Sequence, residues 1–310
     1  MKSILESLLA DAPEPFAAAT FRAWWARVFP SLEGTPVPVD RALLAGLAAD
    51  RLAWAFGAGY QMALRRLDSA LETDSIVSFC ATERDGAHPR AISASFEHGT
   101  LDGQKHWCSL ANEAATLLVV ASRGLDATTG RKDLAVLRVR SAAPGVTIAT
   151  PATAAFVPEL AHCEVRFRDV SVAPEDVLPL ADGYEQGLKR FRTEEDVHVM
   201  AATMGYAMSV ARRHRWPAQA LEALCGPIVA MRACAHEDPS SAAMHVVLDA
   251  ALSSFRRWLG DVEGQWARVE PDERARWDRD RALLDVASRA RAQRLARAWE
   301  RLGMSKGMMA

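Results

Sequence analysis

The chain has 310 residues, half of them hydrophobic, and a formal net charge of −2 at pH 7. This length and composition allow a full buried core shared by two or three lobes, and they exclude a disordered chain. Because neither charge sign dominates, nucleic acid is not expected as a partner. No apolar run reaches the roughly eighteen residues that a membrane span requires, so no membrane partner is expected either.

The cysteines and the amino terminus favour a cytoplasmic protein. The cysteines are odd in number, far apart and mostly within apolar sequence: Cys80, Cys108, Cys163, Cys225 and Cys234. This pattern suits reduced thiols, and the absence of a C-x-x-C pair makes zinc or dithiol redox chemistry improbable. The first eleven residues include Glu6 and lack a cationic lead, so they do not predict a secretion signal.

The amino-terminal part of the chain is predicted to be helical. Apolar residues recur at helical spacing over residues 3–10 and 14–29, with prolines between the segments. A longer helical region runs over residues 40–71. Gly57 and Gly59 lie inside it and are expected to bend or divide it.

The middle of the chain is predicted to form a β structure. Residues 76–80 and 91–96 read as strands around an Asp85-Gly86 turn, and a second turn at residues 101–103 leads into a strand over 105–109. Further strands are expected at 116–123, 134–140 and 146–149. These short strands suit a small closed or orthogonally packed β-sandwich, and no G-x-G-x-x-G follows a strand to suggest a dinucleotide-binding sheet.

Helical periodicity returns after residue 182. Helices are expected over residues 184–214, 218–234, 241–268 and 272–302, which together make a four-helix bundle. Tryptophans expected to be exposed on it would be explained by subunit packing: Trp258, Trp266, Trp277 and Trp299. The predicted fold class is therefore α+β, with a helical domain at 1–74, a β domain at 75–180 and a helical bundle at 181–310.

Several motifs in the β region resemble the middle domain of the acyl-CoA dehydrogenases. They are Ala81-Thr82-Glu83-Arg84, Gly86-Ala87-His88, Leu101-Asp102-Gly103-Gln104-Lys105, Trp107-Cys108-Ser109 and residues 162–178. Their spacing follows the family pattern more closely than their identities do. The resemblance extends to the flanking helices, although the amino-terminal helical domain is shorter than is usual in the family.

This resemblance implies an FAD site. The residues that it places at the cofactor are Phe79, Thr82, Gly86, Ala87, His88, Trp107 and Ser109. Thr82 and Ser109 would hydrogen-bond the ring, Trp107 would lie beside it, and the Gly86 turn would approach the pyrophosphate. His88 replaces the family's serine in that turn. The alternative for each of these residues is a packed strand or turn without a ligand.

The family also uses an Arg-x-x-Phe-Gly element that reaches a neighbouring subunit's cofactor. The matching residues here begin at Arg213, with Trp216 and Pro217 in place of Phe and Gly. Arg213 is accordingly a cofactor-binding candidate. A solvated cationic turn explains the same residues.

The family's reaction needs a carboxylate base for the α proton. The glycine-rich segment that usually carries it has no counterpart in residues 297–307, whereas some relatives place the base on the first bundle helix, where this chain has Glu195 and Asp196. These two residues are the candidate bases, with His198 and His214 as further candidates. Acids in the first turns of a helix are also what the helix dipole favours.

Three functions remain open from the sequence. The first is an FAD-dependent oxidoreductase that dehydrogenates an acyl-CoA or acyl-carrier thioester across its α,β bond, working as a homo- or hetero-oligomer. The second is a degenerate relative without independent catalysis, which binds an acyl carrier or completes a site with a homologous subunit. The third is a flavin-dependent monooxygenase on the same scaffold.

Overall fold

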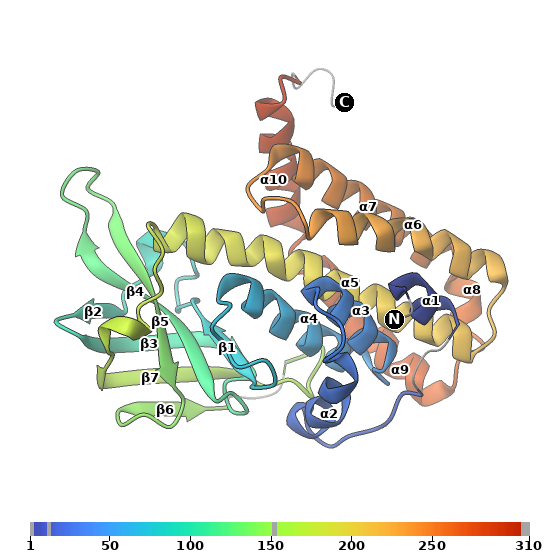
Figure 1. Ribbon diagram of the computed structural model, residues 1–310, viewed down its shortest axis with the longest axis horizontal. Coiled ribbons are helices and arrows are strands. Elements are labelled where there is room, and N and C mark those ends of the chain that lie inside the picture. The colour runs from blue at the N-terminus through green and yellow to red at the C-terminus, as the bar shows by residue number, and fades with distance from the viewer. Residues whose placement is uncertain (1–2, 11–13, 151–153, 305–310) are drawn as a thin grey trace. The chain divides into compact units, whose positions relative to one another are not determined.

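The computed structural model describes residues 3–10, 14–150 and 154–304. The chain folds into two compact units (Figure 1). The helical unit comprises residues 1–63, 155–157 and 193–310, and the β unit comprises residues 64–154 and 158–192. Among the described residues, none of the helices combines the length and apolarity needed to cross a membrane.

The amino-terminal helices are α1 (Ile4–Leu9), α2 (Phe21–Val28), α3 (Pro38–Leu47) and α4 (Leu52–Leu67), with a 3-10 turn at Phe29–Leu32. Ser3 and Glu6 form a capping box at the start of α1, and Thr20 caps α2 by accepting a hydrogen bond from the Ala23 amide. Pro38 occupies the first turn of α3, where its missing N–H costs nothing.

The break in the predicted 40–71 helix falls between α3 and α4, not at Gly57 or Gly59, so that prediction was wrong. Both glycines lie inside α4 because neighbouring groups leave no room for a side chain. A Cβ on Gly57 would lie 2.4 Å from the Phe21 ring, and one on Gly59 would lie 2.5 Å from Val199 Cα. These glycines serve close packing within the helical unit.

The β unit is built on one mixed seven-stranded sheet. Its strands are β1 (Val77–Cys80), β2 (Ser95–Glu97), β3 (Thr100–Ser109), β4 (Thr116–Leu125), β5 (Lys132–Arg140), β6 (Val146–Ala149) and β7 (His162–Ser171). The order is β1-β4-β2-β3-β7-β6, with β5 paired to β4. β4 pairs with β1 and β2 in parallel, and the other pairs are antiparallel. Short 3-10 turns lie at Pro89–Ala91 and Pro174–Asp176.

Burial differs between the strands of this sheet. Residues 117–121 of β4 are fully buried, whereas β7 alternates, with Val165 and Phe167 buried and Arg166 and Arg168 facing outward. A π-helical segment, Gly183–Lys189, packs on β5 at Gly183, where a Cβ would lie 2.1 Å from Leu134 O. One face of the β6–β7 edge is therefore solvated while β4 lies in the core.

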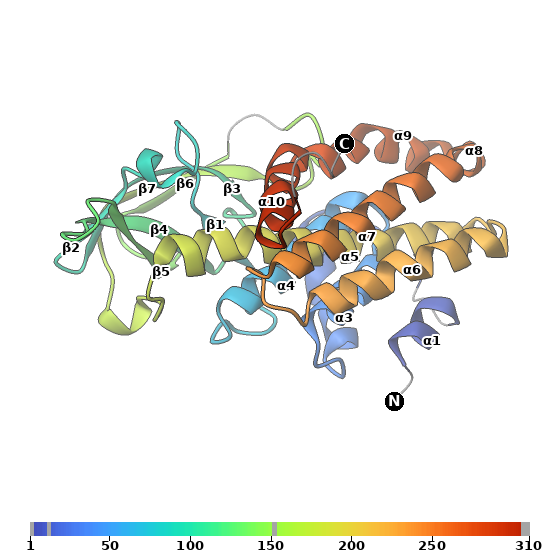
Figure 2. The same ribbon diagram turned by 90° about the horizontal axis from the view of Figure 1, so that it is seen from above.

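The carboxyl-terminal helices are α5 (Arg190–Arg213), α6 (Ala218–Cys234), α7 (Ala242–Asp261), α8 (Glu263–Trp266), α9 (Pro271–Asp280) and α10 (Ser288–Arg301), with a 3-10 turn at Arg281–Asp285. α6 has the predicted bounds, and Figure 2 shows it beside α7. The predicted 241–268 and 272–302 helices are each interrupted, at residue 262 and over residues 281–287.

The bundle tryptophans are core residues. Trp258, Trp266 and Trp277 are buried, and Trp299 is half-buried, so the expectation of exposed tryptophans was wrong for the first three. Trp266 and Trp277 stack with centroids 4.3 Å apart and planes 5° from parallel. Their burial supplies apolar area to the core of the helical unit.

Candidate functional site

The exposed tryptophan of the chain stands at a β-bulge. The register of β3 with β7 shifts between Lys105 and Cys108, and Trp107 in this bulge has a φ of 57°. Its side chain is 66% exposed. A left-handed backbone at a residue other than glycine costs about 1–2 kcal/mol, and bulges commonly re-aim side chains next to functional sites. The bulge thus presents an indole on the surface of the β unit at an energetic cost.

Thr82 and Ser109, the two predicted ring contacts, are neighbours of this bulge. Thr82 O accepts a hydrogen bond of 2.8 Å from the amide of His106, the residue before Trp107. Ser109 Oγ and His162 Nδ1 share a hydrogen bond of 2.9 Å, and the His162 ring lies 5.9 Å from that of Trp107. Thr82 and Ser109 are both half-buried. Thr82, Ser109 and the Trp107 indole are therefore at adjacent strand ends, and the Ser109 hydroxyl is hydrogen-bonded to the imidazole that lies beside the indole.

His162 is a further candidate site residue, to which the motif over residues 162–178 assigned no role. Burial lowers the pKa of His162, so its imidazole is neutral at physiological pH. A neutral ring can either accept the Ser109 proton or donate to the Ser109 oxygen, depending on its tautomer. It lies 53 positions from Ser109 in the sequence and reaches it only through the β3–β7 register.

A buried ion pair fixes the end of β1 against β3. Lys105 is fully buried and its Nζ lies 2.6 Å from Glu83 Oε1. Glu83 also accepts hydrogen bonds from the amides of Ser93 (2.8 Å) and Ala94 (3.0 Å), and from the Ser93 hydroxyl. The sequence placed Glu83 and Lys105 in motifs without a role. The structure makes them the support of Thr82 and the Trp107 bulge.

The two charges of this pair shift each other's titration. Burial alone would raise the pKa of Glu83, but hydrogen bonds from Lys105, Ser93 and the Ala94 amide outweigh it and lower the pKa. Burial lowers the pKa of Lys105, and Glu83 offsets only part of that effect. The adjacent Cys108 thiol has a raised pKa because of its hydrogen bond with Cys80 and its burial, which leaves it an unreactive thiol.

The predicted pyrophosphate turn is partly exposed: Gly86 and Ala87 are half-buried, and His88 is exposed. Gly86 has a φ of 105° and exchanges backbone hydrogen bonds of 2.9 Å with Glu83, which closes a tight turn. Arg192 donates to Ala87 O at 3.2 Å. His88 accepts a hydrogen bond from the Arg90 amide and lines a pocket of about 910 Å³ with Arg90, Arg131 and Tyr184. The turn therefore borders, through His88, an open hollow that is also lined by acidic residues: Asp126, Asp133, Asp182 and Glu185.

Phe79 lies inside the β unit. It is buried on β1, and its ring centroid is 4.3 Å from that of Phe191.

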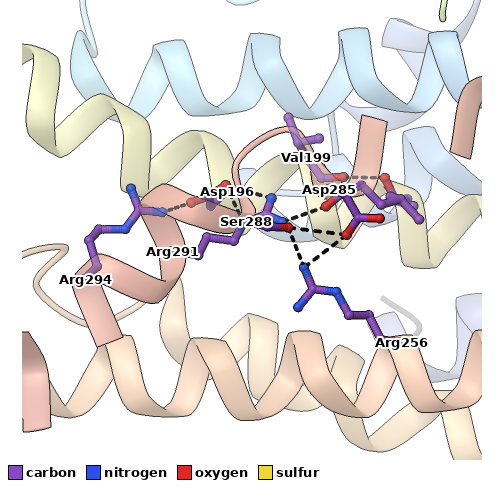
Figure 3. A network of polar contacts seen from close by, with 9 residues as sticks. Asp196, Val199, Arg256, Asp285, Ser288, Arg291 and Arg294 are labelled. Carbon is purple, nitrogen blue, oxygen red and sulfur yellow. Dashed lines mark hydrogen bonds and ion pairs between the residues drawn. The ribbon is translucent and has the colours of Figure 1, made fainter. Parts of the chain in front are cut away.

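The candidate bases lie on α5 in the helical unit. Glu195 is half-buried. Asp196 is buried; Arg291 donates to its Oδ1 from Nε (3.0 Å) and Nη2 (2.8 Å), and Arg294 pairs with its Oδ2 (Figure 3). Both carboxylate oxygens of Asp196 thus serve to hold α10 against α5.

The same network continues along α10. Arg291 also donates to Leu284 O at 2.8 Å, and Arg256 on α7 donates to Ser288 at 3.1 Å and pairs with Asp285 at 3.4 Å (Figure 3). Arg291 and Arg294 of this last helix are therefore paired inside the helical unit.

Arg213 is engaged within the helical unit. Its guanidinium donates to Ser209 Oγ at 2.8 Å and pairs with Glu273, whose second oxygen lies 2.9 Å from His214 Nε2. His198 is fully buried, with its Nδ1 2.7 Å from Glu194 O. Over the described ranges, no cluster of His, Cys, Asp or Glu has a metal-binding arrangement.

Solved structures with this fold include the butyryl-CoA dehydrogenase of Megasphaera elsdenii, with a TM-score of 0.64 and 14% identity over 90% of this chain and 86% of that one. The prolyl acyl carrier protein oxidase AnaB has a TM-score of 0.66 and 14% identity over 96% and 93% of the two chains. The FAD complex of PigA has a TM-score of 0.66 and 13% identity over 92% and 90%. The fold is therefore that of the acyl-CoA dehydrogenases, and the predicted α+β class is confirmed.

The sequence comparisons point the same way. No protein-family model matches the chain. A curated protein, the probable short/branched chain specific acyl-CoA dehydrogenase of Dictyostelium discoideum, is 28% identical over 149 residues, or 46% of this chain. The chain matches only 35% of the length of that relative. The resemblance inferred from the sequence is confirmed: this chain is similar in sequence to an acyl-CoA dehydrogenase over part of its length and has the fold of that family.

Proposed function

We propose that the chain is an FAD-dependent oxidoreductase that dehydrogenates an acyl thioester. The carrying observation is Trp107, an exposed indole held at a left-handed bulge, with the half-buried residues Thr82 and Ser109 next to that bulge in the sheet. An isoalloxazine ring is bound by an aromatic side chain beside its plane and by hydrogen-bonding groups, such as hydroxyls, at its polar edge. FAD complexes are known for a protein of the same fold, PigA.

The residues present fit such a ring in the following roles. Trp107 would lie beside it, and Thr82 and Ser109 would hydrogen-bond its polar edge, with the neutral His162 orienting the Ser109 hydroxyl. The Gly86-Ala87-His88 turn would approach the pyrophosphate, because Gly86 has open space around it and the hollow next to His88 contains Arg90 and Arg131. When bound, the flavin would supply the hydride acceptor.

Proton removal would fall to a carboxylate on α5. Glu195 is our first choice, because it is the more exposed of the two carboxylates, whereas Asp196 is buried. The substrate would lose its α proton to Glu195 and its β hydride to the flavin. The acyl group would be carried as a thioester of CoA or of an acyl carrier, in a homo- or hetero-oligomer in the cytoplasm.

The engagement of Asp196 and Arg213 in internal ion pairs favours a second candidate function. In it, the chain keeps the fold and binds an acyl carrier, or completes a site with a homologous subunit, without catalysis of its own.

The test is an absorbance spectrum of the purified full-length chain after incubation with FAD, followed by anaerobic addition of acyl thioesters. Dehydrogenase function predicts a bound-flavin spectrum that bleaches with a suitable thioester. Trp107→Gly should weaken FAD binding at least about tenfold, through loss of stacking. Glu195→Gln should retain the flavin and lose the bleaching.

The outcomes separate the two functions. Flavin binding without bleaching by any thioester, with bleaching restored by a co-purifying homologous chain, would support the second candidate. A chain that binds no FAD at all contradicts the first proposal.

A further inference from the structure

A pocket lies on the solvated face of the sheet, where β3, β7 and β6 are neighbours (Figure 1). All of its lining residues belong to the β unit. Its volume of about 460 Å³ is within the roughly 300–1,000 Å³ that small-molecule pockets in proteins occupy. This face of the β unit therefore has a hollow large enough for a small ligand.

Strand pairing brings the polar groups of this pocket together. Arg166 on β7 is the register partner of Gln104 on β3 and of Thr147 on β6, and all three line the pocket. Residues directly opposite each other in antiparallel strands have their side chains on the same face of the sheet. Arg168, which also lines the pocket, follows two positions later on β7, a distance of about 7 Å along the strand. One hydroxyl and two guanidinium groups therefore share the same hollow.

The β6 side of the pocket is made of small residues. Gly145, in the turn before β6, has a φ of 87°, and a Cβ there would lie 2.1 Å from Arg168 O. Its carbonyl accepts a hydrogen bond of 3.0 Å from the Arg168 amide, which holds the turn against β7. Ala149, the register partner of Glu164, has only a methyl group as its side chain. Because these side chains are short, space remains beside the two arginines.

The two arginines carry the unpaired charges of this pocket. Both residues are exposed, and neither guanidinium has a hydrogen bond or ion pair with another residue that the structure describes. Glu164 is the acid of the pocket lining; its carboxylate lies 3.1 Å from His106 Nδ1 and accepts a hydrogen bond of 3.3 Å from Gln104 Nε2. Two arginines and one glutamate give the lining a net positive charge, which attracts an anion.

These groups match the chemistry of phosphate. A guanidinium binds a phosphate through two parallel N–H···O hydrogen bonds, and a hydroxyl can donate a further one. A phosphate monoester has nearly two negative charges at neutral pH, which two guanidinium groups balance, whereas a carboxylate has one. We propose that this pocket binds a phosphate group, either inorganic phosphate or the phosphate of a small monoester, held by Arg166, Arg168 and Thr147. The proposal does not rest on the flavin assignment, because these three residues have no role in it.

The experiment is calorimetric titration of the full-length chain with inorganic phosphate, glycerol 3-phosphate and acetate at constant ionic strength, with chloride as the reference anion. At least one of the two phosphates should bind saturably. Acetate should bind at least about tenfold more weakly, because it has a single charge and only two oxygens to accept hydrogen bonds. Tighter binding of glycerol 3-phosphate identifies a monoester as the ligand, and equal or tighter binding of inorganic phosphate identifies the free anion.

Three variants of the pocket test the assignment of its residues. Arg166→Gln and Arg168→Gln should each weaken phosphate binding at least about tenfold, because each removes a charged donor. Thr147→Val should weaken it about threefold, since it removes one neutral donor. All three side chains are exposed, so the fold should be unchanged, and circular dichroism of each variant verifies this.

The matched control is Arg140→Gln at the end of β5. Arg140 is also an exposed arginine of the β unit but does not line the pocket, so this variant changes the net charge equally. It should bind phosphate as the unmodified chain does. The proposal is overturned by absence of saturable phosphate binding, by acetate binding as tight as that of phosphate, by unchanged affinity in both arginine variants, or by equal weakening in Arg140→Gln.

Discussion

Tryptophan is used differently in the two units. In the helical unit, Trp24, Trp54, Trp266 and Trp277 lie in the core, where each contacts other aromatic rings. The β unit has Trp107 alone, two-thirds exposed and on strained backbone. A large apolar side chain in the core is explained by the free energy gained on its burial. An exposed one on a strained backbone costs free energy, and binding of a ligand to that side chain would explain why it is kept. The four predictions below test that difference.

The largest effect is expected in the helical core. Trp266→Ala should lower the free energy of unfolding by about 4 kcal/mol, because it leaves a cavity beside the stacked Trp277 ring. Urea denaturation followed by circular dichroism measures this loss from the shift in midpoint at an unchanged slope. A loss below about 1 kcal/mol would show that the core of the helical unit is not tightly packed.

The buried ion pair under the bulge should give the next effect. Lys105→Met leaves Glu83 buried without its cation and should cost about 3 kcal/mol. Glu83 keeps its bonds from Ser93 and Ala94, which limits the loss. The double variant Glu83→Gln, Lys105→Met should be more stable than Lys105→Met in the same denaturation assay. A double variant that is less stable than the single one contradicts an uncompensated charge as the cause.

Lowering the pH should remove a smaller part of the stability that the Glu83–Lys105 ion pair contributes. The folded pKa of Glu83 lies below its ordinary value of 4.5, so its contribution is complete above that pH and is lost as pH falls through the folded pKa. Unfolding free energy measured between pH 6 and pH 3 should therefore fall less steeply below about pH 4.5 in Glu83→Gln than in the unmodified chain. If unfolding free energy falls with pH equally in Glu83→Gln and in the unmodified chain, other carboxylates cause the acid sensitivity.

The smallest effect on stability is expected at Trp107. Trp107→Gly relieves a left-handed backbone and removes an exposed ring, so the free energy of unfolding should stay the same or rise by up to about 1 kcal/mol. Thermal unfolding of the chain without added FAD measures it. A loss of 2 kcal/mol or more would mean that the indole is structural, and the contrast with Trp266 would disappear.

Much of the fold could be predicted from local sequence. The helix predicted over residues 218–234 has the bounds of α6, and the strands predicted at 116–123, 134–140 and 146–149 match β4, β5 and β6 to within two residues at each end. The predictions failed where tertiary packing decides. Gly57 and Gly59 suggest a break by propensity, but the helix continues because these positions face other backbones and rings.

The candidate site was only partly visible in the sequence. The motifs around Thr82, Trp107 and Ser109 drew attention by their spacing to strand ends that are neighbours in the sheet. The positive φ of Trp107 depends on a register shift that no motif encodes. His162 pairs with Ser109 through strand pairing across 53 positions, so a search by sequence proximity could not find it.

The exposure of Trp107 also gives the chain a built-in optical reporter. Of its nine indoles, this is the one that a dissolved collisional quencher such as iodide can reach freely, since the others are buried or half-buried. The quenchable fraction of the intrinsic fluorescence therefore reports on a single surface position. Any molecule that settles over the bulge would shield that fraction from iodide, whatever its own colour.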